Sequence, residues 1–107
     1  PEEFGGSDTG PMPTEFVAIG LASCFCLAIA FSARKRDIDP GEIAVDVTPH
    51  RAGAEPRHGR YEISVRGSLD QETLEKLVEG AKRVCWVSNT LQTAPEFAYR
   101  VEGAASG

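Results

Sequence analysis

The sequence is short and acidic, which limits the classes of protein it can encode. Its 107 residues fit a single domain, and 41% apolar with 25% charged residues is ordinary for a globular chain, unlike a disordered segment, a collagen or a coiled coil. The 11 Lys and Arg against 16 Asp and Glu give a net charge of −5, which argues against sequence-independent nucleic-acid binding, because that needs basic charge. A domain this small is only marginally stable alone, so a partner subunit or a cross-link is expected.

The two ends of the sequence predict loose segments around one domain over 1–107. Residues 1–13 are rich in Gly, Pro and acidic side chains and predict a loop, and the small residues of 103–107 predict a loose tail. We therefore expect 1–10 and 103–107 to be flexible. The sequence begins at Pro1 without an initiator Met, as a fragment, a processed product or a trimmed chain does.

Residues 16–33 carry no charge and allow three interpretations. A membrane span needs roughly 20 apolar residues, but Ala, Ser, Gly and Cys dilute this run. Leu21-Ala22-Ser23-Cys24 matches the pattern of a bacterial lipoprotein signal, yet that signal needs a preceding basic segment and an apolar run that ends at the Cys. Here acidic Glu15 precedes the run, and the run continues to Phe31. The pattern favours a helix buried nearly all round, without a membrane partner.

This first helix has recognisable ends, and two strands follow it. Pro11 and Pro13 suit its start, and the basic residues 34–36 suit its end, where the helix dipole favours cations. Apolar and polar residues then alternate over 43–48 and again over 60–66. Two half-buried strands joined by the polar loop 50–59 are therefore predicted, most simply as a hairpin.

A second helix and a last strand complete the predicted fold. Ser68 opens the helix, with Gln71 three residues later as a capping box. Its apolar stripe is Leu74, Leu77, Val78, Ala81, Val84 and Cys85. Phe97, Tyr99 and Val101 alternate as a final strand. The order helix–strand–strand–helix–strand predicts an α+β fold in which an antiparallel sheet packs on a long buried central helix.

Three strands can cover only one side of the first helix. A helix that is apolar on every face needs a second cover. The simplest cover is a second copy of the chain, with the two first helices packed at the core of a homodimer.

The three cysteines are too few for a secreted disulfide scaffold and suit an intracellular protein with one or two functional thiols. Cys24 and Cys26 project about 200° apart on a helix, so they cannot readily bond each other. Cys85 lies at the end of the second helix and could meet Cys24 if the two helices pack together. Inert buried thiols are the alternative that spacing alone leaves open.

The remaining polar groups give weaker signals. His50 and His58 share a loop with Arg51, Arg57 and Arg60, which is either a solvated basic loop or an anion site. The cysteines and histidines lack any zinc spacing, so neither a metal nor a cofactor is expected.

The chemistry is carried by two motifs that resemble a known family. Gly10-Pro11-Met12-Pro13-Thr14-Glu15-Phe16, followed by Ala22-Ser23-Cys24, resembles the GPxPxEL…ALxxC stretch of the OsmC/Ohr family. Cys85-Trp86-Val87-Ser88-Asn89-Thr90-Leu91 is similar to its second signature, CPVSxTL, with Trp86 where Pro is usual. The resemblance runs from Gly10 to about Val101.

The resemblance implies a cytoplasmic thiol-dependent peroxidase for organic hydroperoxides, built as an intertwined homodimer and serving oxidative stress defence. It implies that Cys24 is the peroxidatic thiol, that Cys85 resolves it, and that Glu15 is a candidate polar partner. The reductant is expected to be a lipoylated protein or a dithiol. The N-terminal strands of the family, which carry its activating Arg, are expected to be absent from this chain. Arg34, Arg36 or an Arg of the partner subunit could take the place of that Arg.

A second interpretation is that the chain is a member of the same family without catalytic activity. The wall around Cys24 (Phe25, Leu27, Ala28 and Phe31) is apolar and would suit a fatty or aromatic hydroperoxide. The same wall is compatible with a non-catalytic dimeric domain that binds a small hydrophobic ligand.

Overall fold

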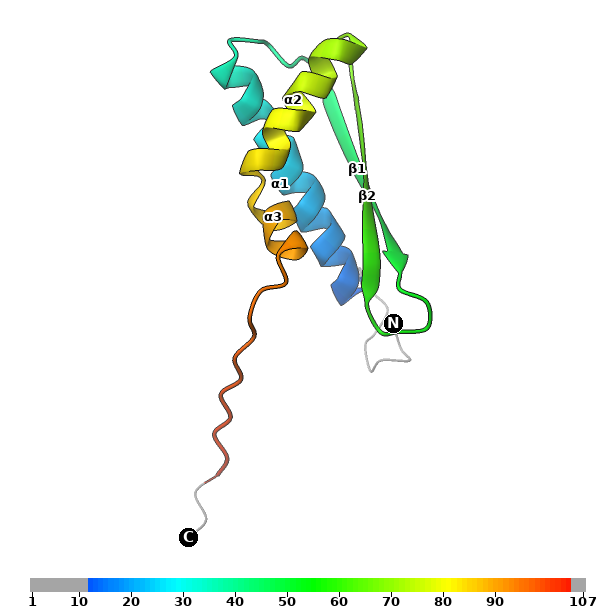
Figure 1. Cartoon of the computed structure of the whole chain (residues 1–107), viewed down its shortest axis with the longest axis vertical. Coiled ribbons are helices and arrows are strands. Elements are labelled where there is room, and N and C mark those ends of the chain that lie inside the picture. Colours follow the sequence, from blue (N-terminus) through cyan, green and yellow to red (C-terminus); the bar gives the residue numbers. More distant parts are fainter. Residues whose placement is uncertain (1–11, 105–107) are drawn as a thin grey trace.

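The computed structural model describes residues 12–104 as three helices and one β-hairpin (Figure 1). The elements in chain order are α1 (Pro13–Lys35), β1 (Ile43–Arg51), β2 (His58–Gly67), α2 (Gln71–Val84) and α3 (Trp86–Gln92). Helix α1 contacts β1, α2 and α3, so it is the central element. The predicted α+β class, with an antiparallel sheet on a long central helix, is confirmed. Residues 1–10 and 105–107, which the sequence predicts to be flexible, lie outside the described residues.

The ends of α1 agree with the sequence. Pro13 is its first residue, a position where the missing N–H of proline costs no helical hydrogen bond. Acidic Glu15 lies in its first turn and basic Arg34 and Lys35 lie in its last turn, where the helix dipole favours these charges. By length and composition α1 could cross a membrane, but the core helix of a globular domain passes the same test. Here α1 supplies most of the buried core.

The hairpin is longer than predicted. Val45 lies opposite Val65 and Val47 opposite Ile63, and these inward-facing residues are half-buried. The strands extend to Arg51 and begin again at His58, which shortens the loop to 52–57. The Arg51 guanidinium donates to the loop carbonyls of Ala54 and Glu55, each at 3.1 Å, and so closes the turn.

The predicted capping box at the start of α2 is wrong. The N-cap is Asp70, whose carboxylate accepts the Thr73 N–H at 3.1 Å. Gln71 is then the first residue of the helix, where its side chain cannot reach back to Ser68 and instead donates to Glu75 at 2.8 Å. Both Ser68-x-x-Gln71 and Asp70-x-x-Thr73 have the spacing of a cap, and the turn before the helix selects the second.

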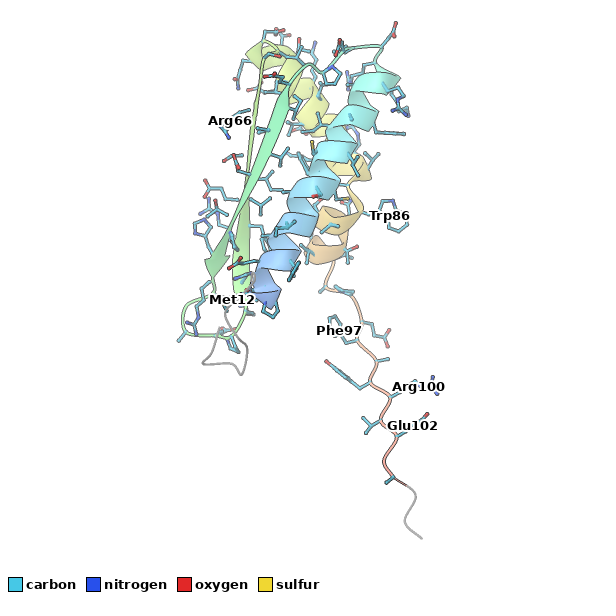
Figure 2. All side chains as sticks on the ribbon, turned by 180° about the vertical axis from the view of Figure 1, so that it is seen from behind. Met12, Arg66, Trp86, Phe97, Arg100 and Glu102 are labelled. Atoms are coloured by element: carbon cyan, nitrogen blue, oxygen red, sulfur yellow. The ribbon has the colours of Figure 1, made fainter. Side chains whose placement is uncertain are left out.

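Two differences lie after Cys85. The first is the short helix α3, which the sequence analysis did not predict. The final strand expected at Phe97, Tyr99 and Val101 is not formed: within 12–104, residues 93–104 have no strand partner, and these three side chains are 71%, 82% and 90% exposed. We call residues 93–104 the C-terminal arm, and it runs away from the hairpin (Figures 1 and 2).

The core lies on one side of α1 only. Its buried apolar residues are Leu21, Phe25, Ala28, Ile29, Ala33, Leu77, Ala81 and Cys85. On its bare side, Phe16, Ile19 and Leu27 are 60%, 52% and 71% exposed. Burial nearly all round is therefore not achieved within one chain.

Helices α1 and α2 approach each other closely at one glycine. A Cβ added to Gly80 would collide with the side chain of Ser32. Gly80 is thus what allows α2 to lie against α1, and this contact brings the end of α2 to the middle of α1.

Candidate functional site

The structure brings Cys24 and Cys85 together. Cys24 lies in the middle of α1, partly buried and packed against the core. Cys85 is fully buried at the junction of α2 and α3, where it is the C-cap of one helix and the N-cap of the other. Both are free thiols, and the Cys85 side chain contributes to a lowered pKa of Cys24.

The start of α3 contributes to the chemistry of this site. The first N–H groups of a helix have no partner within it, and α3 begins directly after Cys85. Hydrogen bonding to the Val87 backbone is the largest cause of a lowered pKa of Cys24. Burial opposes it by raising that pKa, and hydrogen bonding to the Cys85 side chain and the Trp86 backbone lowers it further. The pKa of Cys24 is therefore lower than that of an ordinary thiol.

Within the described residues this lowering owes nothing to a charged side chain: its causes are hydrogen bonds and burial alone. Arg34 and Arg36, considered above as substitutes for the activating Arg, are exposed at the far end of α1. Arg34 is about 15 Å along the helix from Cys24.

The structure does not bring Glu15 to this thiol pair within one chain. Glu15 is exposed in the first turn of α1. Nine helical residues place it about 180° around the helix axis and about 13.5 Å along it from Cys24.

The other candidate groups of the sequence form no second site. Within 12–104, no group of three or more metal-ligating side chains comes together. His50 lies 3.0 Å from the Glu62 carboxylate, and Arg57 pairs with Glu55 at 2.6 Å. The basic loop is thus largely neutralised by its own carboxylates, as a solvated surface is.

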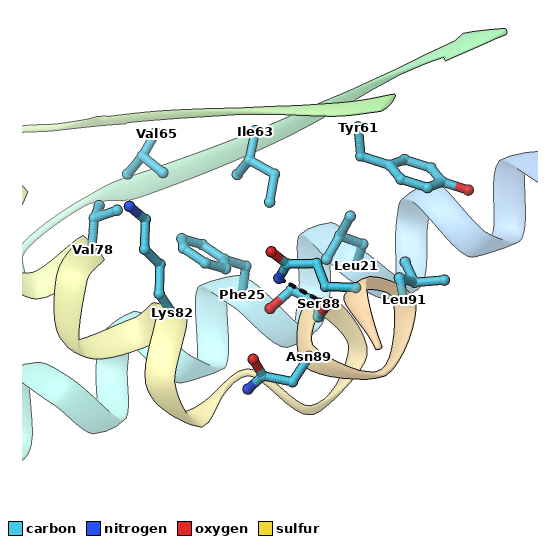
Figure 3. Close-up of a pocket in the computed structure, with 11 residues that line it drawn as sticks. Leu21, Phe25, Tyr61, Ile63, Val65, Val78, Lys82, Ser88, Asn89 and Leu91 are labelled. Carbon is cyan, nitrogen blue, oxygen red and sulfur yellow. Dashed lines mark hydrogen bonds between the residues drawn. The ribbon is translucent and has the colours of Figure 1, made fainter. Parts of the chain in front are cut away.

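An apolar cavity of about 460 Å³ lies between the hairpin and the helices. Tyr61, Ile63 and Val65 extend into it from β2, opposite Leu21 and Phe25 of α1 (Figure 3). The remaining lining residues come from α2 and α3: Val78, Lys82, Ser88, Asn89, Leu91 and Gln92. The cavity is adjacent to the thiol pair through Phe25, but neither cysteine lines it.

Sequence reasoning missed two parts of the site, namely α3 and the contribution of its backbone to the pKa of Cys24. The signal for α3 was present in the residues after Cys85, where Trp86, Val87 and Leu91 recur at helical spacing, but a helix of seven residues is too short for a clear period.

Two solved structures resemble this chain in both fold and sequence. The organic hydroperoxide resistance protein OsmC of Legionella pneumophila is 26% identical, with a TM-score of 0.62 over 87% of this chain and 70% of that protein. A Vibrio cholerae protein assigned to organic hydroperoxide resistance, with captopril bound in one of its active sites, is 31% identical, with a TM-score of 0.63 over 88% and 67%.

A third structure supports the fold alone, and a curated relative extends the likeness to archaea. An OsmC-like hydroperoxide resistance protein of Jannaschia sp. CCS1 is 22% identical, with a TM-score of 0.71 over 94% of this chain and 73% of that one. The uncharacterized protein MJ0573 of Methanocaldococcus jannaschii is 33% identical over 84 residues. The match covers 74% of this chain and spans only 43% of the length of that relative.

The family itself follows from the profile match. The profile of OsmC-like proteins matches residues 5–100, which includes both cysteine motifs and every helix and strand described above. The chain belongs to the OsmC/Ohr family of OsmC-like proteins.

Proposed function

We propose that this chain reduces organic hydroperoxides through a redox pair of Cys24 and Cys85, in oxidative stress defence. The observation that carries the proposal is the packing of Cys24 against the core that holds the fully buried thiol Cys85, together with a lowered pKa of Cys24. Relatives named for hydroperoxide resistance support a role in peroxide or stress defence.

The proposed reaction has three steps. The Cys24 thiolate attacks the O–O bond of the hydroperoxide and takes one oxygen, so that a sulfenic acid forms and an alcohol leaves with a proton. The Cys85 thiol then attacks the sulfenic sulfur, which forms a disulfide and releases water. A dithiol reductant, such as a lipoylated protein, returns both cysteines to thiols and becomes a disulfide itself.

The arrangement of donors suits the first two steps. The lowered pKa of Cys24 favours the attacking thiolate, and Cys24 packs against the core that contains the proposed resolving thiol Cys85. The apolar side chains next to Cys24 favour a fatty or aromatic hydroperoxide over hydrogen peroxide, because they offer burial to a carbon chain.

We propose that the working form is a homodimer. The bare side of α1 exposes apolar side chains such as Phe16 and Leu27, and the C-terminal arm exposes three more. Exposed apolar surface of this extent is expected at a protein interface. A second copy would also be needed for Glu15 to act as a polar partner, since Glu15 does not reach Cys24 of its own chain. A cytoplasmic location agrees with three free thiols.

The dimer is tested by adding a charge to the bare side. Leu27→Glu is expected to give a monomer in sedimentation experiments. Ala54→Glu, which adds the same charge in the exposed hairpin loop, is expected to leave the dimer intact. A monomeric parent chain contradicts the proposal.

The activity is tested with cumene hydroperoxide and dihydrolipoamide. Cys24→Ser is expected to abolish peroxide consumption, whereas Cys26→Ser, a matched change two residues away on the same helix, leaves it unchanged. Turnover that survives Cys24→Ser removes Cys24 as the peroxidatic thiol.

The cavity beside the hairpin favours a second candidate function, the binding of a small hydrophobic ligand without catalysis. Its walls are apolar and its rim carries Lys82 and Asn89. Ile63→Trp fills the cavity and is expected to abolish binding of an anilinonaphthalene sulfonate probe, while Thr48→Trp on the outer face of the hairpin does not. Probe binding combined with no peroxide consumption by the parent chain favours this second function.

A further inference from the structure

The outer edge of β2 is open within one chain. The sheet of the described residues holds two strands, and β1 pairs along one edge of β2. The apolar cavity of about 460 Å³ and a second hollow of about 620 Å³ are lined by β2 and by helices, and none of their lining residues comes from β1. Val65 and Val78 border both hollows. An open strand edge beside apolar surface is a place where a further strand can pair.

The C-terminal arm has the residue pattern of a strand, but within 12–104 it pairs with none. Its large apolar side chains alternate along the chain and are largely exposed: Phe97, Tyr99 and Val101. Its charged side chains fall at the other positions of the alternation: Glu96, Arg100 and Glu102. In an extended chain, one face of the arm is therefore apolar and the other is charged.

Strand β2 has the same division into two faces. Tyr61, Ile63 and Val65 are half-buried and pack against the core, whereas the residues between them are exposed. The charged members of the exposed face are Arg60, Glu62 and Arg66. Along β2 these charges run positive, negative, positive, and along the arm they run negative, positive, negative.

One antiparallel register joins all of these charges to their opposites. It places Arg100 opposite Glu62. The two outer pairs are then Glu96 with Arg66 and Glu102 with Arg60. The same register sets the apolar residues of the arm beside those of β2: Phe97 with Val65, Tyr99 with Ile63, and Val101 with Tyr61. Opposite charges that face each other across neighbouring strands stabilise the pairing, and like charges destabilise it.

The neighbouring antiparallel registers lack this complementarity. A shift of two residues keeps the apolar faces together, because side chains alternate with a period of two. In one direction the shift brings Glu102 opposite Glu62, and in the other it brings Arg100 opposite Arg60. Charge therefore selects a single antiparallel alignment of the arm on β2.

The arm of the same chain does not reach this alignment. Leu91, near the end of α3, lies towards the Tyr61 end of β2 (Figure 3). The alignment needs Glu96 beside Arg66, which is about 17 Å along the strand from Tyr61. The four residues from Gln92 to Glu96 span at most about 14 Å, and the arm leaves α3 away from the hairpin (Figure 1). An antiparallel arm on β2 therefore belongs to a second copy of the chain.

A parallel arm of the same chain is the competing arrangement. With Glu96 opposite Arg60, it places Arg100 opposite Ser64 and leaves Glu62 facing Ala98. The central charge pair is then lost. The pair of Arg100 and Glu62 thus distinguishes the two arrangements, and charge complementarity favours the second copy.

We propose that each chain of the homodimer lays its C-terminal arm on β2 of the other chain, antiparallel and with Arg100 opposite Glu62. The exchanged arm is the third strand of the partner's sheet. Its apolar side chains extend the wall that Tyr61, Ile63 and Val65 give to the cavity beside the thiol pair, so this cavity is complete only in the dimer. The inference rests on the proposed function in taking the working form to be a homodimer.

The pairing is tested by reversing its central charges. Arg100→Glu and Glu62→Arg each place like charges opposite each other at both arms of the dimer. Each is expected to raise the dissociation constant of the dimer about tenfold in sedimentation experiments at low salt, because two contacts are reversed. Arg57→Glu, the same kind of change in the hairpin loop, is expected to leave the constant unchanged.

Mixing the two variants identifies the chain that each arm contacts. In a heterodimer of the Arg100→Glu chain with the Glu62→Arg chain, both arms meet an opposite charge, so the dissociation constant of the parent is expected to return. A mixture that dimerises no better than the single variants overturns the inference, because the arm then does not cross to the other chain. Single variants that dimerise as tightly as the parent also overturn it.

The cavity wall is tested by tryptophan fluorescence in a Trp86→Phe chain. Tyr99→Trp places an indole on the face of the arm that is turned towards the cavity, and Ala98→Trp places one on the solvent face. On dimer formation the emission of the first is expected to shift to shorter wavelength, whereas the second keeps the emission of an exposed indole. Equal emission from the two variants in the dimer overturns the wall.

The outcomes separate this inference from the proposed function. A parent chain that is monomeric overturns both the exchanged arm and the homodimer. A dimer that is indifferent to the charge reversals keeps the homodimer and loses the exchanged arm. None of the measurements uses peroxide, so a chain that passes them but consumes no hydroperoxide keeps the exchanged arm and loses the catalysis.

Discussion

Cys24 and Cys26 lie two residues apart on α1, at opposite edges of its buried face. Of the two, Cys24 is the one that packs against the hydrophobic core. Both are partly buried, but Cys24 also has a lowered pKa that the α2–α3 junction helps to set. Cys26 is not among the residues packed against the core. The difference shows that the surroundings of a thiol on this helix depend on which elements pack against its edge.

The largest expected effect separates the two proposed chemical steps, namely attack on the hydroperoxide by Cys24 and formation of the disulfide with Cys85. Cys85→Ser is expected to reduce steady-state turnover with a dithiol to background, because no resolving thiol remains. One equivalent of alcohol per chain should still form, because the α3 backbone still lowers the pKa of Cys24. The measurement is rapid-quench detection of cumyl alcohol beside steady-state peroxide consumption. Loss of the first turnover as well would mean that Cys85 is needed for attack.

The next effect concerns the pH dependence of alkylation at Cys24. The pKa of Cys24 is lowered, so its thiolate is already populated at pH values below those at which an ordinary thiol titrates. Alkylation of Cys24 in a Cys26→Ser chain should therefore rise and reach its plateau below the pH range of free cysteine. A profile that coincides with that of free cysteine in an unfolded peptide contradicts the lowered pKa of Cys24.

A smaller effect tests how the two helices are held together. Gly80→Ala places a methyl group against Ser32 and is expected to cost about 1–3 kcal/mol of unfolding free energy. It should also slow formation of the Cys24–Cys85 disulfide, because α2 must move away from α1. Gly20→Ala is the matched control: nothing lies within 4 Å of its Cβ, and Ala at this mid-helix position stabilises by up to about 1 kcal/mol. Urea unfolding and disulfide formation are measured for both, and opposite signs are expected.

The smallest effect is at the start of α2, far from either cysteine. The Asp70 pKa is lowered because its carboxylate accepts hydrogen bonds from the side chain and backbone N–H of Thr73. This contribution to stability is present above the ordinary pKa of Asp and is lost as pH falls through the lowered value. Asp70→Ala should lower the midpoint of thermal unfolding by a few degrees at neutral pH, and the gap to the parent should close in acid. A gap that persists in acid would point to packing instead of the cap.

Periodicity was sufficient to predict the hairpin and α2, because each buries one regular face, whereas α1 was predicted from its uncharged run and from the residues that suit its two ends. It could not predict that the alternation at Phe97, Tyr99 and Val101 lacks a strand partner within one chain, since a strand pattern does not specify which strand pairs with it. The cap of α2 was misassigned between two motifs of equal spacing, and only the preceding turn distinguishes Ser68 from Asp70.

The site was predictable to the level of its cysteines and no further. The two motifs named Cys24 and Cys85, but their contact depends on the close approach at Gly80, which has no signature in sequence spacing. The contribution of the α3 backbone to the pKa of Cys24 was missed because a backbone N–H leaves no mark on the residue type, except at proline.

The burial of Cys85 has a consequence for how electrons enter the molecule. Cys85 is 0% exposed, whereas Cys24 lies at the edge of the covered surface. In the proposed reaction the two would be joined as a disulfide, and an incoming thiolate could then approach only the Cys24 sulfur in line with the S–S bond. The mixed disulfide with the proposed reductant would form at Cys24 with Cys85 as the leaving group, so the same sulfur would receive the oxidant and the reductant in turn.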